Sequence, residues 1–152
     1  MPYTTAEGRQ QLLDELAQAT EKISLALANL GEAYEALDER SAERLEEQLF
    51  GPAQLALGRA KRAHAAFAQR HGMPLHSFGS ASAGAPSSGF KGFLEAAVQA
   101  IQASDNELAQ LQDSMLPIEV GDGELRGDLQ EIRLLLDQLP ARAHQMLRTF
   151  GR

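Results

Sequence analysis

The sequence predicts an all-α protein made of two antiparallel helical hairpins, joined by a Gly/Ser/Ala-rich crossover into a three- to four-helix bundle. Helix-favouring Ala, Leu, Gln, Glu and Arg dominate, and aromatic residues make up only 5% of the chain. Apolar residues recur at three- and four-residue steps over most of its length. The stretch SFGSASAGAPSSG at 77–89 interrupts this pattern. We therefore expect a single helical domain over 1–152, with hairpins at about 4–72 and 89–150 and a flexible linker at about 73–88.

The first predicted helix begins after Thr4 or Thr5, both suitable N-caps, and continues to Leu49. One stripe runs along it without a break, at positions Leu12, Leu16, Ala19, Ile23, Leu27, Leu30, Tyr34, Leu37, Ser41, Leu45 and Leu49. Gly51 suits a helix C-terminus and Pro52 suits the first turn of the next helix, so we expect the chain to reverse there. Gly31 marks a second place where the first helix could break.

The second predicted helix covers 52–71 and ends at Gly72, with Pro74 beyond it. A turn at Gly51 would set Leu45 beside Leu57 and Tyr34 beside Phe67. The same register would pair the acidic block at 32–47 with the basic block that follows it, through Glu43 and Arg59, Glu39 and Arg62, and Glu32 and Arg70. Such pairing accounts for the uneven charge distribution better than a nucleic-acid-binding surface does.

The third predicted helix begins after Ser87 or Ser88 and ends before Pro117, and Asp122 caps the fourth. Ser104 and Glu107 have the spacing of a capping box, but we expect one continuous helix there. Pro140 should kink the fourth helix near Leu136. Six apolar pairs share one antiparallel register: Met115 with Leu125, Leu111 with Leu129, Leu108 with Ile132, Ile101 with Leu139, Leu94 with Met146, and Phe90 with Phe150.

The linker is long enough to join the two hairpins in either relative orientation. Residues 73–87 span roughly 22 Å as a coil or about 50 Å when extended, whereas the second helix is about 30 Å long. A crossover tether is the expected role, and a functional disordered loop is the alternative.

Several function classes are excluded or disfavoured by composition. The chain has no cysteine, and its net charge of -7 disfavours general nucleic-acid or anionic-membrane binding. No signal peptide or membrane-spanning stretch is visible, so we expect a cytoplasmic protein. Glu-x-x-His does not occur, and His64 and His71 lie about 10 Å apart along a helix axis, too far to share a metal. We expect no metal, no cofactor and no enzymatic activity.

The first helix would be about 68 Å long, more than the second helix can cover. The stripe formed by Leu12, Leu16, Ile23, Leu27 and Leu30 must therefore be buried elsewhere. It packs either on the second hairpin, as ordinary core, or on another protein or a second copy of the chain. We predict a non-catalytic protein–protein interaction module: an adaptor, an accessory subunit or a chaperone-like helical protein.

The sequence also offers residues for two other functions. A nucleic-acid-associated small helical subunit would use the basic residues Arg59, Lys61, Arg62 and Arg70. A phosphotransfer protein would centre on His144. The segment AHQMLRTFGR resembles the histidine boxes of sensor kinases and phosphotransfer domains in its His and in the later Leu147, Arg148 and Thr149, and lacks the acidic neighbour, the Pro and the Lys of those boxes.

Overall fold

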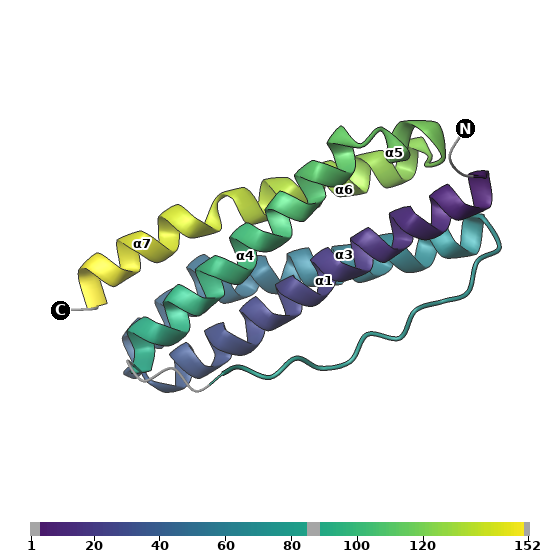
Figure 1. The fold of residues 1–152 in the computed structure, drawn as a ribbon. Helices are drawn as coiled ribbons and strands as arrows, with labels where there is room; N and C mark the ends of the chain where they lie inside the picture. Colours follow the sequence, from purple (N-terminus) through teal and green to yellow (C-terminus); the bar gives the residue numbers. More distant parts are fainter. Residues whose placement is uncertain (1–3, 85–88, 151–152) are drawn as a thin grey trace.

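The computed structural model describes residues 4–84 and 89–150 and confirms an all-α bundle (Figure 1). No strand occurs in these two ranges, and none of their helices is both long and apolar enough to cross a membrane. The elements are α1 (Thr5–Glu35), α2 (Glu39–Leu45), the π-helix η1 (Glu46–Phe50), α3 (Gly51–Arg70), α4 (Gly89–Asp113), α5 (Leu116–Glu119), α6 (Gly123–Asp137) and α7 (Leu139–Phe150).

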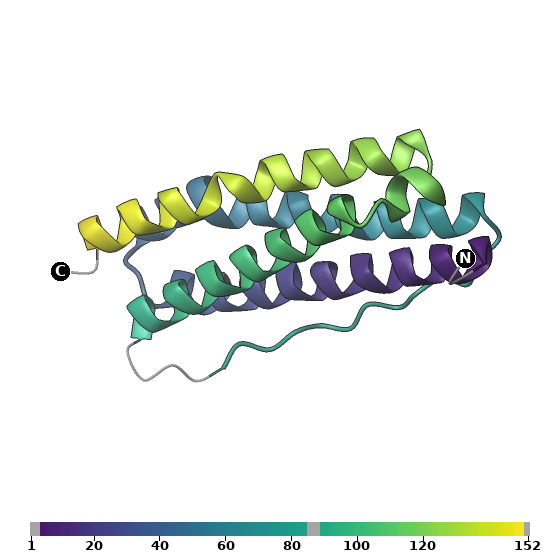
Figure 2. The same cartoon turned by 45° about the horizontal axis from the view of Figure 1, so that its top comes forward.

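Four helical rods surround one core: α1, the continuous segment of α2, η1 and α3, then α4, and last the consecutive helices α6 and α7. The most extensive contact joins α1 to α4; α1 also packs on α3, α3 on α6, and α4 on α7. Each of these neighbours runs antiparallel to the next, whereas α3 and α4 run parallel on a diagonal (Figures 1 and 2). Residues 71–84, which follow α3, run back beside α1 toward the end of the bundle where α4 begins, as the crossover prediction requires. The topology is a four-helix bundle with one long crossover.

Small residues bring α1 and α4 close together. Ala19 and Ala26 of α1 and Ala97 of α4 are fully buried. With so little side chain between the backbones, the buried Ser104 hydroxyl reaches across and donates to the Ala19 carbonyl at 2.8 Å. The capping-box spacing at Ser104 therefore marks a contact between helices, and α4 is continuous through it, as predicted.

The first chain reversal lies at residues 36–38, and the predicted turn at Gly51 is wrong. α1 continues through Gly31 and ends at Glu35, after which Asp38 caps α2 by accepting from the Ser41 N–H at 2.8 Å. From Glu39 to Arg70 the chain then forms a single unbroken rod of α2, η1 and α3. The turn at Gly51 that was expected to bring Tyr34 beside Phe67 is therefore absent, because the chain is helical through Gly51.

A π-helix lets the rod pass through Pro52. In η1 the Gly51 N–H donates to the Glu46 carbonyl, five residues earlier. A Cβ at Gly51 would lie only 3.1 Å from that carbonyl, so glycine suits this turn. Pro52 leaves the Gln48 carbonyl without its usual helical donor, and Arg142 of α7 supplies one at 3.1 Å. The Gly-Pro pair thus marks an altered helical turn and not a helix end.

The expected pairing between acidic and basic blocks is also wrong. Glu39 and Glu43 lie on the same rod as Arg59 and Arg62, so the rod cannot fold them against each other. Arg59 pairs instead with Asp128 of α6 at 3.7 Å. The basic side of α3 is matched by α6 rather than by the acidic block.

Most predicted helix ends are confirmed. Thr4 forms a capping box with Glu7, Gly72 follows α3 with a φ of 64°, and Asp122 caps α6. The break expected from Pro140 occurs at Gln138, between α6 and α7. The predicted caps Ser87 and Ser88 lie outside the described residues. Met115 is 46% exposed, so the pair it was expected to form with Leu125 is not part of the core.

Replacement of Met115 by glycine is expected to stabilise the protein. Met115 is the one non-glycine residue with positive φ in the described ranges, at 70°, and it follows the end of α4. A side chain in this left-handed region costs energy that glycine avoids. We expect Met115→Gly to raise the free energy of unfolding by about 0.5–1 kcal/mol in urea titrations. Met115→Ala, which keeps the Cβ, should give no such gain; an equal gain from Met115→Ala would contradict the strain argument.

Candidate functional site

The apolar stripe of the first helix is core in the folded chain. Leu12, Leu16 and Ile23 are fully buried, Leu30 is 1% exposed, and Leu27 is partly buried against the same core. α4 supplies most of the surface that covers α1. The stripe is therefore not available to a partner of the folded monomer. Of the two destinations that the sequence left open, the structure places it on the second half of the chain.

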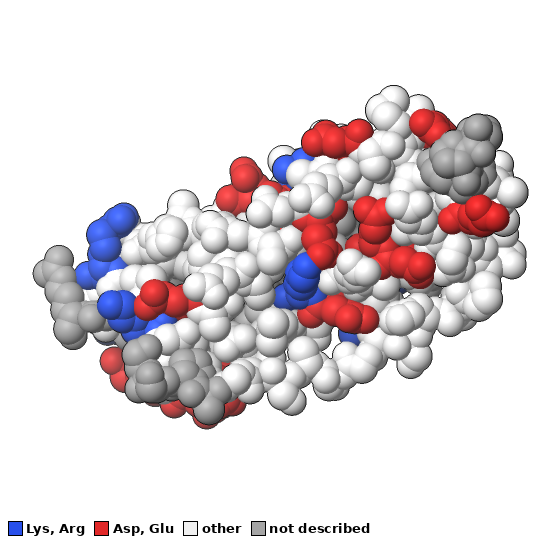
Figure 3. Space-filling view, viewed as in Figure 1, with Lys and Arg blue, Asp and Glu red and all other residues white. Residues whose placement is uncertain are grey.

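The basic residues of α3 do not form a free cationic patch. Arg70 pairs with Asp122 at 2.8 Å and with Glu124 at 2.9 Å, and Arg59 pairs with Asp128. Lys61 and Arg62 lie between them on α3. On the face seen in Figure 3, acidic side chains are widespread and Lys and Arg are scattered among them. Arg59 and Arg70, two of the four residues predicted for a nucleic-acid-binding surface, are therefore held in internal ion pairs.

Asp122 joins the end of α3 to the start of α6. Arg70 donates to both of its carboxylate oxygens, at 2.8 and 2.9 Å, and the Leu125 N–H donates at 2.8 Å. The His71 ring nitrogen lies 3.0 Å away. Partial burial acts to raise the pKa of Asp122, but these hydrogen bonds, led by Arg70, outweigh it and hold the pKa well below its usual range. The cluster is a structural tie between two helices.

A histidine cluster fastens the crossover to the bundle. His64 of α3 is only 3% exposed, and its ring centroid lies 5.6 Å from that of His76 and 5.4 Å from that of Phe78. The His76 ring nitrogen in turn lies 3.8 Å from a carboxylate oxygen of Glu21 on α1. Burial lowers the pKa of His64, and the neighbouring His76 lowers it further, while the Leu13 backbone and Asp14 act in the opposite direction.

Because of this cluster, stability should fall as the pH drops below the ordinary histidine pKa. The unfolded chain protonates His64 near pH 6.5, whereas the folded chain holds it neutral to a lower pH, so the unfolded state binds more protons in that window. Urea titrations should show the free energy of unfolding decreasing between about pH 7.5 and pH 5.5. His64→Phe should weaken this dependence and the exposed His144→Gln should keep it. Equal pH dependence in the two variants would contradict the assignment.

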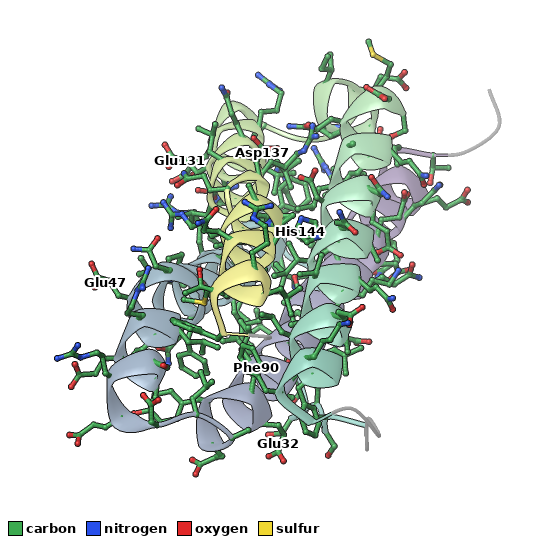
Figure 4. All side chains as sticks on the ribbon, turned by 90° about the vertical axis from the view of Figure 1, so that its left-hand side faces the viewer. Glu32, Glu47, Phe90, Glu131, Asp137 and His144 are labelled. Carbon is green, nitrogen blue, oxygen red and sulfur yellow. The ribbon has the colours of Figure 1, made fainter. Side chains whose placement is uncertain are left out.

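His144, the residue on which a phosphotransfer function would centre, is exposed on α7 (Figure 4). Across residues 4–84 and 89–150 no three His, Asp or Glu side chains are placed to hold a metal ion.

The acidic block at 32–47 lies at one end of the bundle, around the corner between α1 and α2. Glu32 and Glu47 point away from the helices there (Figure 4). In the part of the chain that the structure describes, every ion pair involves other residues, so none of the block's seven acids is paired. Of the two arginines among them, Arg44 lies over the Phe150 ring, 5.4 Å from its centroid.

A hollow of about 260 Å³ opens beside this block. The last turns of α1 and the π-helix line it, with Gly31, Tyr34, Glu35, Glu46 and Phe50. Tyr34 is 36% exposed, and Phe50 is partly buried against the core. Apart from its chain neighbours and the nearby backbone of α1, no atom of the described residues lies within 4 Å of the position that a Gly31 Cβ would occupy, so the hollow is open there.

Sequence reasoning missed this hollow because it treated Gly31 and Gly51 only as helix breakers. One signal was available: the acidic residues of 32–47 remain in excess wherever the chain reverses. Comparison of the chain with protein-family models, curated proteins and solved structures gives no match.

Proposed function

We propose that the protein is a non-catalytic protein–protein interaction module, and that it binds a basic partner at the acidic end of the bundle. The observation that carries the proposal is the set of seven acidic residues around the α1–α2 corner, none of which has an ion-pair partner within residues 4–84 and 89–150. Acidic residues that are not matched within the fold attract a partner of opposite charge and speed its association. The buried stripe of α1 has no part in this contact.

Two triple variants with equal charge change test the proposal. The first changes Glu32, Glu43 and Glu47 to Gln at the acidic end. The second changes Glu119 and Glu131 to Gln and Asp113 to Asn, which are exposed and lie away from that end, in α5, in α6 and at the C-terminus of α4. The intact protein and both variants are used to capture partners from a lysate of the native cells. Any protein retained by the wild type is then purified and titrated against all three.

We expect the wild type and the second variant to bind the same basic protein, and the first variant to bind it at least about tenfold more weakly. The affinity should fall as salt rises. Equal binding by the two variants would rule out the acidic end as the docking surface. Retention that nuclease treatment abolishes would favour the nucleic-acid-associated alternative.

A further inference from the structure

We infer that the hollow beside Gly31 is a receptor for an arginine side chain of the basic partner. This inference rests on the proposed function and adds the chemistry that the contact recognises. The hollow combines two aromatic rings, Tyr34 and Phe50, with two carboxylates, Glu35 and Glu46, on its walls. In residues 4–84 and 89–150 neither carboxylate has an ion-pair partner.

The chemistry of the walls selects a flat cation. Aromatic faces attract cations through their quadrupole, and carboxylates at the rim neutralise the charge. A guanidinium group can stack on a ring and at the same time donate two parallel hydrogen bonds to a carboxylate, which an ammonium group cannot do. An arginine side chain therefore fits these walls better than a lysine side chain.

The local backbone explains why the hollow is open. α1 contributes glycine where any other residue would project a side chain into the space. On the other side the π-helix carries Glu46 and Phe50, one at each end of its five residues, and both line the hollow. π-helical turns are costly and occur frequently at functional sites. A glycine in a helix interior and a π-helix each lower the stability of their own helix, and both line the same hollow.

Two matched substitutions test the inference. Gly31→Leu should fill the hollow without a clash, since nothing lies within 4 Å of its Cβ, and should leave the melting temperature equal or higher. Gly127→Leu on α6 makes the same change at another open helical position. The probe is Nα-acetyl-arginine amide, with acetyl-citrulline amide as its uncharged counterpart, and binding is followed by NMR shifts of backbone amides.

We expect the arginine probe to shift the amides of Gly31, Tyr34 and Phe50 in the wild type and in Gly127→Leu. Gly31→Leu should bind it at least about tenfold more weakly, and the citrulline probe should bind weakly to all three proteins. Equal binding of the arginine probe by the two leucine variants, or equal binding of the arginine and citrulline probes, would overturn the inference.

The two proposals fail separately. A basic protein that depends on Glu32, Glu43 and Glu47 but binds Gly31→Leu as well as wild type would leave the proposed function standing and remove the arginine receptor. Arginine binding in the hollow without capture of any protein would support the receptor and remove the proposed function.

Discussion

Ile23→Glu is expected to prevent folding. Ile23 is fully buried on the face of α1 that packs against α4, so glutamate there would be an unpaired charge inside the core. A buried charge without a partner costs about 3–5 kcal/mol, in addition to the lost apolar burial, and domains of this size have about 5–15 kcal/mol in total. Far-ultraviolet circular dichroism should show loss of helix and no cooperative urea transition.

Leu25→Glu provides the control, two residues along the same helix. Leu25 is 38% exposed, so the new charge remains solvated and should change the free energy of unfolding by less than about 1 kcal/mol. If Ile23→Glu proved as stable as Leu25→Glu, the stripe would not be core, and its use as a docking surface for another protein would be open again.

The second large effect is expected at Asp122. Asp122→Ala removes the cap of α6 and leaves Arg70 without its bidentate partner. A lost N-cap costs about 1 kcal/mol, and the partly exposed ion pair adds a similar amount at most. We expect urea titrations to show a loss of about 2 kcal/mol. Asp122→Asn keeps a capping oxygen and should lose less.

The two Asp122 variants also separate by pH. The hydrogen bonds to Asp122 lower its folded pKa, so its contribution is fully present above the unfolded pKa near 4 and is lost progressively as the pH falls from there through the folded pKa. The wild type should therefore lose its advantage over Asp122→Asn progressively as the pH falls below about 5. Glu131→Gln, an exposed change elsewhere on α6, should track the wild type throughout. An Asp122→Ala protein as stable as Glu131→Gln would contradict the role of this tie.

Helix class, most caps and the crossover could be predicted because they depend on neighbouring residues. The first corner could not be found from periodicity, since Tyr34, Leu37, Ser41 and Leu45 keep helical spacing across it. Asp38 was the local signal, a good N-cap placed directly after an apolar residue. The stronger breaker, Gly51-Pro52, drew the prediction to the wrong position because the compensating donor, Arg142, comes from another helix.

The candidate site was harder to predict from the sequence than the fold was. The hollow requires the end of α1 and the π-helix to lie side by side, and that arrangement follows from the corner at 36–38. The unpaired state of the acidic block also depends on this corner, since a turn at Gly51 would have set Glu32, Glu39 and Glu43 against arginines of the next helix. Misplacing the corner reversed the prediction for both features.

The chain could be cut in the crossover to give two separate helical hairpins. α1 finds its most extensive contact in α4, on the other side of the segment that returns along the bundle, and each hairpin covers the apolar face of the other. A chain interrupted between Gly79 and Gly84 would keep every helix intact and lose no contact between helices. Each fragment alone would expose an apolar face, so the two should assemble into a heterodimer when they are produced together. The protein would then serve as a split reporter, because each half folds only when it binds the other.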